Sequence, residues 1–322
     1  MSKIERFFNM QRIANQDRRV EALLDNIGKV IKGKAGIIEL VVTALLAPGH
    51  VLIEDVPGVG KTKLATALAV SCGGTFGRIQ MTPDIMPSDV TGFSFLRPGS
   101  YDMEFRRGAV FCNFLLADEI NRASPKSQSA LLESMEEHSV TIDEKTYRLP
   151  EPFMVLATQN PVETFGTFPL PEAQMDRFLF RLHIGYPDKE DELSILQRES
   201  EISVETLGSV VSLNDILFLR ECARNVYISA SLERYILEIV HGTREAEEIR
   251  LGVSPRGSIA LHKAAKAYAF LKGRDFVLPD DIKYLCPYSF AHRISLSAKG
   301  KSVWGSGFNA IEKIVSRIEV PV

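Results

Sequence analysis

The sequence has 322 residues, of which 45% are hydrophobic and 25% are charged, and this composition is typical of a globular protein with a large core and a second, smaller domain. The formal net charge of −3, without long lysine or arginine blocks, disfavours a surface built generally for nucleic acid but does not exclude a local basic pore. No apolar run approaches the roughly 20 residues of a membrane helix, and the polar N-terminal residues lack the apolar block of a signal peptide, so we expect a cytoplasmic protein without a membrane span.

The first half of the chain alternates β-branched runs with helical patterns, which predicts an α/β fold with a parallel sheet sandwiched by helices. We predict helices over residues 37–46 and 61–71, and a third that opens at Ser124-Pro125, an N-cap and first-turn pair, and runs to about residue 138. Strands are predicted over residues 50–54, 76–81, 111–117 and 153–158. The last three are apolar on both faces, as central parallel strands must be.

The pattern changes after Tyr186-Pro187-Asp188, beyond which helices follow one another almost without strands. They are predicted over residues 189–199, 213–225, 232–242, 254–272 and 308–318. Because such a helical block does not easily join a sheet, we expect it to pack as a separate lid. We therefore divide the chain into an α/β core, residues 1–187, and an α-helical lid domain, residues 188–322.

The strongest chemical signal is a glycine-containing loop between the first predicted strand and the helix that follows it. Gly58 and Gly60 allow backbone N–H groups to close around phosphate oxygens, and the helix N-terminus adds partial positive charge. Lys61 is predicted to neutralise the β- and γ-phosphates of a nucleotide, and Thr62 to offer its hydroxyl to Mg²⁺. The predicted nucleotide-binding run is Asp55, Val56, Pro57, Gly58, Val59, Gly60, Lys61, Thr62 and Lys63.

The loop departs from the GxxxxGK[ST] pattern at its first position, where Asp55 replaces glycine. Aspartate tolerates the left-handed backbone conformation, so we expect the loop to close with Asp55 as a turn residue. A carboxylate near phosphate is nevertheless unusual. The sequence leaves open whether Asp55 weakens ATP binding.

Polar side chains also follow two other predicted strands. Asp118 and Glu119 end an apolar strand, where Asp118 can hold Mg²⁺ and Glu119 can polarise the water that attacks the γ-phosphate. Asn160 follows the next strand, where its amide can position that water. Without the loop at Lys61, these residues would be read as a solvated acidic turn and a common Asn–Pro turn. With it, the three segments predict one site for nucleotide hydrolysis.

Four longer motifs resemble the MoxR family of AAA+ ATPases, a helix-2-insert group related to magnesium-chelatase ATPase subunits. They are TPDIMPSDVTG at 82–92, ADEINRA at 117–123, ATQNP at 157–161 and GTFPLPEAQMDRF at 166–178. The resemblance extends from about Ile27 to the helix after Ser254. It implies a P-loop (AAA+) sheet domain with a lid, ATP and Mg²⁺ as cofactors, and assembly into a hexameric ring. It also implies the residue roles: Lys61 and Thr62 are the Walker A pair, Asp118 and Glu119 the Walker B pair, and Asn160 the first sensor.

The resemblance also assigns roles to two arginines. It implies that Arg177 is an arginine finger that reaches a neighbouring subunit's γ-phosphate, where a guanidinium neutralises charge that develops in phosphoryl transfer. The alternative for Arg177 is an ion pair within its own chain, with Asp176 or Glu172. The sequence does not assign Arg122 to its own site or a neighbour's.

Three further residues lie outside the central motifs. Arg256, after Ser254-Pro255 at a helix start, resembles the second sensor on the lid, and its alternative is a solvated arginine at a capped helix start. Whether it acts on its own subunit or the next stays open. Ile31 and Gly33 stand where the family lodges adenine, a weak signal without that resemblance.

Two hairpins are expected in the core domain. The segment of about residues 92–110 fits the family's helix-2 insert and reads as strand, turn and strand. In a ring it would point at the central pore, although a hairpin that only caps the core fits the sequence equally well. A second hairpin, about residues 139–150, matches the one that precedes the first sensor in the same group.

The resemblance implies an ATP hydrolase whose ring drives chaperone-like remodelling or maturation of partner proteins with a von Willebrand factor A domain. One alternative is a nucleotide-gated binding switch with little turnover, although Glu119 and Asn160 are both present. A nucleic-acid motor ranks lower, because Arg106-Arg107 is the only basic pair in the insert. Mg²⁺ is the only metal predicted, since the cysteines are reduced thiols without zinc-site spacing: Cys72, Cys112, Cys222 and Cys286.

Overall fold

The computed structural model describes residues 18–99, 102–161, 166–187, 189–197 and 204–321. Its centre is one parallel sheet of five strands in the order β2-β5-β8-β1-β9. The strands are β1 (Val51–Glu54), β2 (Phe76–Gln80), β5 (Phe114–Asp118), β8 (Met154–Gln159) and β9 (Phe180–Leu182). This sheet confirms the predicted α/β fold and the predicted neighbourhood of the strands that end at Asp118 and Gln159.

Two details of the strands differ from the prediction. β2 was expected to be a central strand, but it lies at the edge of the sheet, and only Ile79 in it is buried. β5 begins at Phe114 rather than at Phe111. Residues 111–113 bend before it, and the Asn113 side chain accepts a hydrogen bond from the backbone N–H of Thr75 at 3.1 Å.

The sheet separates two hydrophobic clusters, because alternate residues of a strand point to opposite faces. In β5, Phe114 and Leu116 face one cluster while Leu115 and Ala117 face the other. Helices α2 (Ala35–Leu46) and α3 (Lys61–Ser71) cover the first face, and α5 (Pro125–Glu137) covers the second. As predicted, α5 begins after an N-cap at Ser124, whose hydroxyl accepts from the Ser127 N–H.

The lid is helical, as expected, with one short β-ladder. Its elements are α7 (Lys189–Gln197), α8 (Leu213–Arg224), α9 (Ala230–Glu245), β10 (Ile249–Leu251), α10 (Pro255–Leu271), α11 (Pro279–Phe290), β11 (Ser295–Leu296), α12 (Ala298–Trp304) and α13 (Gly307–Arg317). The sequence analysis missed α11 and α12, in which Pro287 and Gly300 interrupt the helical signal. Residues 198–199 of the predicted helix over 189–199 lie outside the described residues.

The lid does not stand apart from the core. α10 lies against α2, and the hydrophobic cluster on that face of the sheet continues into α8, α9, α10 and α11. Arg220 of α8 also donates from Nε to the Leu45 carbonyl oxygen at 2.8 Å. The lid helices and this face of the sheet therefore share one hydrophobic core, and the division at residue 187 stays a prediction.

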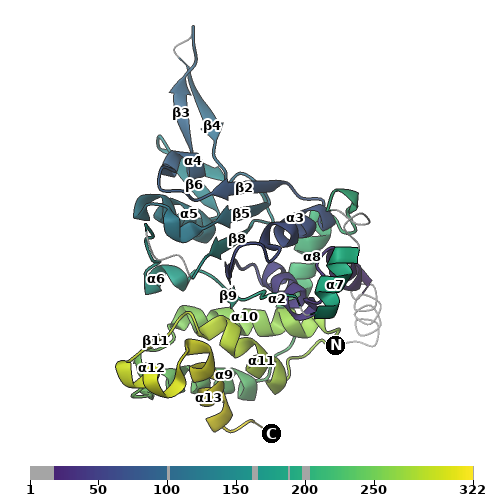
Figure 1. The fold of residues 1–322 in the computed structure, drawn as a ribbon, viewed down its shortest axis with the longest axis vertical. Helices are drawn as coiled ribbons and strands as arrows, with labels where there is room; N and C mark the ends of the chain where they lie inside the picture. The colour runs from purple at the N-terminus through teal and green to yellow at the C-terminus, as the bar shows by residue number, and fades with distance from the viewer. Residues whose placement is uncertain (1–17, 100–101, 162–165, 188, 198–203, 322) are drawn as a thin grey trace.

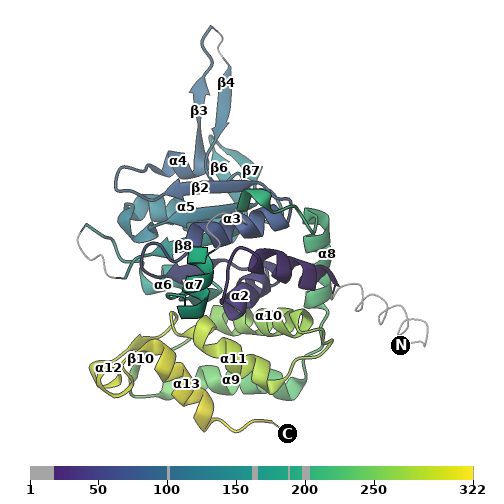
Figure 2. The same cartoon turned by 45° about the vertical axis from the view of Figure 1, so that its right-hand side comes forward.

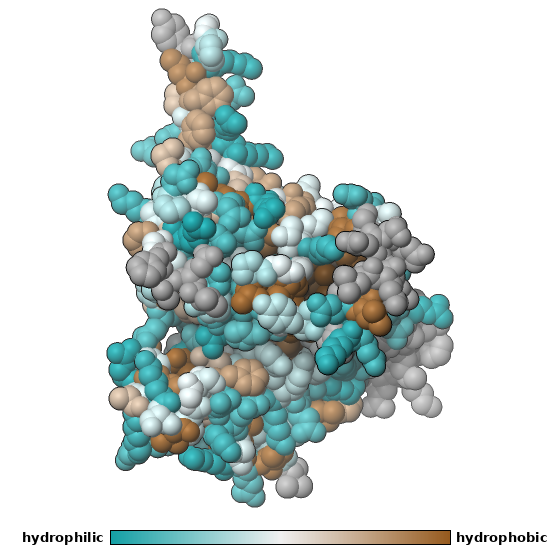
Figure 3. Space-filling view, in the orientation of Figure 1, coloured by the Kyte–Doolittle hydropathy of each residue, from teal (hydrophilic) through white to brown (hydrophobic). Residues whose placement is uncertain are grey.

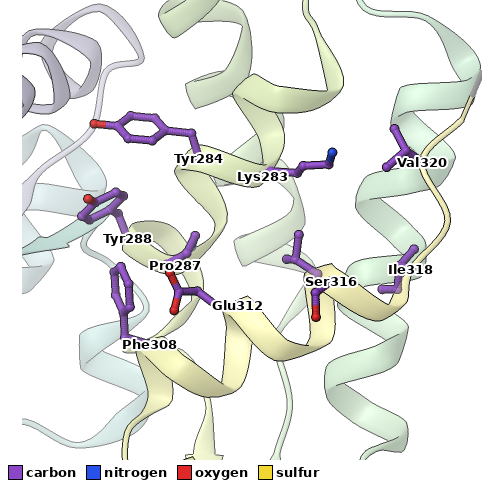
Figure 4. Close-up of a pocket in the computed structure, with 10 residues that line it drawn as sticks. Lys283, Tyr284, Pro287, Tyr288, Phe308, Glu312, Ser316, Ile318 and Val320 are labelled. Atoms are coloured by element: carbon purple, nitrogen blue, oxygen red, sulfur yellow. The ribbon is translucent and has the colours of Figure 1, made fainter.

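A groove of about 430 Å³ lies on the lid between α11 and α13 (Figure 4). Tyr284, Tyr288 and Phe308 follow one another along it, with ring centroids 5.6 and 5.4 Å apart. None of its lining residues comes from the central sheet or from the loop at residues 55–63. The groove is therefore separate from the site that the sequence motifs predict.

Both expected hairpins are present. β3 (Gly92–Leu96) pairs with β4 (Met103–Arg107), after the short helix α4 (Pro87–Thr91), and this hairpin stands out from the end of the molecule opposite the lid (Figures 1 and 2). Residues 100 and 101, the predicted end of the turn and start of the second strand, lie outside the described residues. Apolar side chains on the hairpin reach the surface (Figure 3), among them Leu96 and Met103.

The second hairpin, β6 (Ser139–Ile142) and β7 (Lys145–Arg148), turns at Asp143 and Glu144, both with positive φ. The two hairpins contact each other, because the Phe105 ring stacks on the Tyr147 ring with centroids 4.1 Å apart. A stacked ring pair therefore joins the two hairpins.

Across the described residues, no helix combines the length and the apolar character that a bilayer span requires. The same residues contain no group of three or more His, Cys, Asp or Glu side chains placed to hold a metal ion. The four cysteines are free thiols, and Cys72, Cys112 and Cys286 are buried. Burial raises the pKa of Cys72 and of Cys112 to about 12, so both thiols are protonated at neutral pH.

Candidate functional site

The loop between β1 and α3 has the backbone conformation that its glycines permit. Gly58 and Gly60 have φ values of 90° and 92°, which side chains with a Cβ rarely adopt. A Cβ at either position would meet no atom within 4 Å, so the backbone conformation rather than crowding requires glycine. Gly60 is the N-cap of α3, and the first turn of that helix therefore opens toward the loop.

Asp55 does not take the role that the sequence suggested. The non-glycine residues with positive φ in the described chain do not include Asp55, so it is not a left-handed turn residue. Its carboxylate accepts hydrogen bonds from the N–H groups of Val56 at 3.0 Å and Gly185 at 2.7 Å. Asp55 is 8% exposed. The carboxylate therefore ties the start of the loop to the segment after β9.

Lys61 extends back along the loop. Its ammonium group donates to the Asp55 carbonyl oxygen at 2.7 Å. Partial burial lowers the pKa of Lys61, while the charges of Asp55, Asp118 and Glu119 oppose that shift. The ammonium group is thus held by the loop backbone, among carboxylates, where an incoming anion can pair with it.

Asp118 ends β5 beside the loop and is also buried. Its Oδ1 accepts from the Thr158 hydroxyl of β8 at 3.1 Å, and its Oδ2 accepts from Nε of Arg78 on β2 at 2.8 Å. The Thr158 hydroxyl in turn accepts from the Glu119 N–H at 2.9 Å. Side chains from the two strands that flank β5 therefore fix this carboxylate.

Glu119 follows in a strained backbone conformation, with φ of 56°. Its Oε2 accepts hydrogen bonds from Gln80 at 2.8 Å and from Arg122 at 3.0 Å. Gln80 lies directly opposite Asp118 in the β2–β5 register. The strain and the two donors hold the carboxylate at the carboxyl edge of the sheet, where ligand sites of parallel sheets lie.

These side chains line one cleft of about 330 Å³ at that edge. The lining combines the glycine loop with the tips of β2, β5 and β8: Pro57, Gly58, Gly60, Lys61, Thr62, Lys63, Arg78, Gln80, Asp118, Glu119, Thr158 and Asn160. The structure therefore brings together the loop, the acid pair and the amide that the sequence predicted to share a site. Asn160 is buried at the end of β8.

Other predicted site residues lie elsewhere. Val56 is in the loop but not among the lining residues, and Val59 packs against the hydrophobic core. Ile31 also packs against this core. Gly33 has φ of 67° and lies against the Asp191 carboxylate of α7, which occupies the space where a Cβ would extend. Neither Ile31 nor Gly33 lines the cleft, and α7 lies beside Gly33.

Arg177 and Arg256 also lie outside their own chain's cleft, and they meet at one carboxylate. Arg177 pairs with Oε2 of Glu136 at 3.1 Å, and Arg256 pairs with Oε1 of the same side chain. The alternative, an ion pair of Arg177 with Asp176 or Glu172, is therefore wrong about the partner, which is Glu136. Glu136 of α5 therefore forms ion pairs with two arginines, Arg177 of the core and Arg256 of the lid.

Sequence reasoning missed three residues of the cleft: Arg78, Gln80 and Thr158. Arg78 and Gln80 are two positions apart on one strand, so they share a face. The polar alternation in residues 76–81 was the available signal. It was overlooked because that strand was expected to be central and apolar on both faces.

Comparison with known proteins places this site in a family. Residues 50–180 match the model of the ATPase family associated with various cellular activities (AAA), and residues 241–312 match the AAA lid domain. Among curated proteins, an uncharacterised protein YeaC of Bacillus subtilis is 52% identical over 300 residues, 93% of this chain and 94% of that protein. Chaperone MoxR1 of Mycobacterium tuberculosis is 38% identical over 318 residues, 96% of this chain and 84% of that protein.

A solved structure shares the fold along the whole chain. The crystal structure of a candidate ATPase from Cytophaga hutchinsonii superposes with a TM-score of 0.90 at 41% sequence identity. The match covers 99% of this chain and 100% of that one. The α/β core and the helical lid are therefore shared with that protein.

Proposed function

Because the chain belongs to the MoxR family of AAA ATPases, we propose that it hydrolyses ATP to ADP and phosphate, with Mg²⁺, in the cleft at the carboxyl edge of the sheet. The observation that carries the proposal is the convergence of Lys61, Asp118 and Glu119 on that cleft. A phosphate-binding loop, a pair of acids and a polar amide are the parts that phosphoryl transfer to water requires.

In this proposal the loop holds the nucleotide's phosphates through its backbone and Lys61. Thr62 and Asp118 line the same cleft and offer a hydroxyl and a carboxylate oxygen, the donor types that Mg²⁺ prefers. When bound, Mg²⁺ would neutralise charge on the phosphate oxygens. The Arg78 guanidinium group pairs with the Asp118 carboxylate. This carboxylate therefore already binds one cation, which supports its proposed role in holding Mg²⁺.

Glu119 is the proposed base for the attacking water, and Asn160 the residue that orients it. The Glu119 carboxylate accepts from Gln80 and Arg122, so its direction is fixed. Both donors bond Oε2, so a proton from water can pass to Oε1 while they stay in place. This supports a role for Arg122 in its own subunit, as a residue that holds Glu119 in position.

Arg177 and Arg256 are proposed to act on a neighbouring subunit in a hexameric ring. Neither lines its own cleft, and both are held at Glu136, on the α5 side of the molecule. The γ-phosphate of the next subunit would compete with Glu136 for them. A guanidinium supplied in this way is worth about 10³ to 10⁵ in rate.

We propose that hydrolysis drives remodelling or maturation of a partner protein in the cytoplasm. A relative that shares 38% identity over nearly the whole chain carries the name Chaperone MoxR1, which supports a chaperone-like role. A von Willebrand factor A domain is the partner class that the family resemblance implies.

We also propose that Ile31 and Gly33 contact the adenine of the nucleotide. Helix α7, which lies beside Gly33, would form the neighbouring wall.

A nucleotide-gated switch with little turnover is a second candidate. One observation favours it: Arg78 pairs with Asp118 and Arg122 pairs with Glu119, so both acids of the cleft are held by arginines of their own chain. A nucleic-acid motor has no such support.

The two leading candidates separate in one experiment. ATP turnover and particle mass are measured against protein concentration for wild type, Glu119→Gln, Arg177→Ala and a mixture of the two variants. Turnover that rises with assembly, is lost in each variant and returns in the mixture supports shared sites in a ring. Turnover that stays negligible in the assembled wild type, with tight ATP binding, would favour the switch. Turnover that is independent of concentration and unaffected by Arg177→Ala would reject the ring.

A further inference from the structure

The segment that carries Arg177 has little regular structure of its own. It consists of the one-turn helix α6 (Glu172–Met175) and residues 176–179 before β9. Its backbone hydrogen bonds are local, apart from the Leu179 N–H, which donates to the His50 carbonyl oxygen at 2.8 Å. Side-chain contacts must therefore set where Arg177 lies.

Arg293, just after α11 in the lid, donates several of the hydrogen bonds that this segment accepts. Its side chain is 2% exposed, and its Nε donates to Oδ1 of Asp176 at 2.7 Å. The remaining donors reach backbone oxygens on both sides of Arg177: the Asp176 carbonyl at 3.1 Å, the Phe178 carbonyl at 2.6 Å and the Leu179 carbonyl at 3.2 Å. Other bonds, to Ser289, anchor the guanidinium group within α11.

Neighbouring lid residues reinforce the same contact. The buried His292 ring lies with Nε2 at 2.9 Å from the Phe178 carbonyl oxygen. The hydroxyl of Ser254, the N-cap of α10, donates to Oδ2 of Asp176 at 2.8 Å. Arg250 of β10 donates to Glu172 at 3.0 Å. Three parts of the lid thus contact the segment that carries Arg177.

The chemistry of Arg293 makes this contact specific in geometry. A buried guanidinium group is costly unless its charge is paired and its N–H groups are bonded, and here both conditions are met. Its planar fork fixes the directions of its donors, which a lysine ammonium group does not reproduce. The segment and the lid are therefore held in one relative orientation.

We propose that Arg293, paired with Asp176, is the positioning residue of Arg177. It makes the lid and the arginine-bearing segment one rigid unit, so that a lid movement carries Arg177 toward or away from the neighbouring subunit's cleft. The proposal rests on the ring of shared sites described above. It adds a route by which the nucleotide state of one subunit, through its lid, reaches catalysis in the next.

Mixing of variants tests the direction of this effect. Glu119→Gln subunits donate Arg177 but cannot turn over, and Arg177→Ala subunits turn over only with a donated arginine. Arg293→Met is placed either in the donor or in the acceptor. Since a displacement of about 1 Å can cost about 10²-fold in rate, we expect the donor placement to lower the kcat of the mixture about 10- to 100-fold. The acceptor placement should leave kcat within about twofold.

Arg274→Met is the matched control. Arg274 also forms a partly buried arginine–aspartate pair, with Asp281 at 2.6 Å, but entirely within the lid. In the donor it should leave the rescued turnover unchanged. Binding of a fluorescent ATP analogue to each variant checks that the cleft is intact. The particle mass of each mixture checks that the ring is intact.

Equal losses in donor and acceptor, or no loss in either, would overturn the positioning role. If Arg293→Met does not fold, Arg293→Lys carries the same comparison, with a smaller expected loss in the donor only. Failure of the original Glu119→Gln and Arg177→Ala mixture to regain turnover would instead reject the shared site itself. The two proposals therefore fail in different measurements.

Discussion

His50 links acid stability to the core of this fold. The ring is buried between β8 and α5, with Nδ1 accepting from the Val155 N–H at 3.0 Å and Nε2 at 3.0 Å from the Met135 carbonyl oxygen. A protonated ring could not accept from Val155. Burial, the largest cause, lowers the pKa of His50 from 6.5 to about 4.

The sign of the effect on stability follows from the two states. Above pH 6.5 the ring is neutral in both folded and unfolded chains, so His50 adds no pH dependence. Between pH 6.5 and about 4 the unfolded chain binds a proton that the folded chain does not. The free energy of unfolding therefore falls as the pH is lowered through this range. At about 1.36 kcal/mol per pH unit, the difference between 6.5 and about 4 corresponds to about 3 kcal/mol.

The assay is urea unfolding of wild type and His50→Gln at about pH 7.5 and about pH 4.5. His50→Gln is expected to be less stable at the higher pH, since it loses one ring contact, but to lose about 2 to 3 kcal/mol less than wild type on acidification. The exposed His241 provides the control, because His241→Gln should keep the wild-type loss. Burial also lowers the pKa of His292 and His138, so a smaller acid loss should remain.

If His50→Gln loses as much stability as wild type between the two pH values, the reasoning is wrong. That result would mean that the folded state admits the proton, by opening the contact to Val155. A wild-type loss that begins only below about pH 4 would contradict the buried neutral ring in the same way.

Three further predictions concern the cleft. Lys61→Ala should weaken binding of a fluorescent ATP analogue by about 10- to 100-fold, since it removes a charge-assisted hydrogen bond of about 1.5 to 3 kcal/mol; unchanged affinity would place the phosphates elsewhere. Arg78→Gln should lower the Mg²⁺ concentration for half-maximal turnover by about two- to fivefold, because it frees Asp118 from a half-exposed ion pair; a higher requirement would instead make Arg78 part of the binding site. Asp55→Ala should cost about 2 to 5 kcal/mol in urea unfolding, because two N–H groups lose their acceptor. The comparison is Asp215→Ala, which removes a more exposed carboxylate from the capping box of α8 and should cost about 0.5 to 2 kcal/mol. Equal losses would show that burial of Asp55 does not matter.

The sequence by itself determined the sheet and most of the cleft. The short apolar runs of the strands and the loop from Gly58 to Thr62 have local causes, namely the burial of central parallel strands on both faces and the backbone freedom of glycine. Parallel strands end at one edge, so the tips at Asp118 and Asn160 could be placed together from their spacing alone. The helical pattern after residue 188 predicted the lid, and the family resemblance added the roles proposed for Arg177 and Arg256.

Tertiary structure alone decided which polar groups meet. Strand order is a long-range property, and the pairing of β2 with β5 is what brings Arg78 and Gln80 to the cleft. Glu136 pairs with Arg256 across 120 positions, and Arg293 pairs with Asp176 across 117. Such pairs depend on how the lid packs against the core, because a charge is buried only where the folded chain supplies its partner. No local pattern in the sequence encodes that partner.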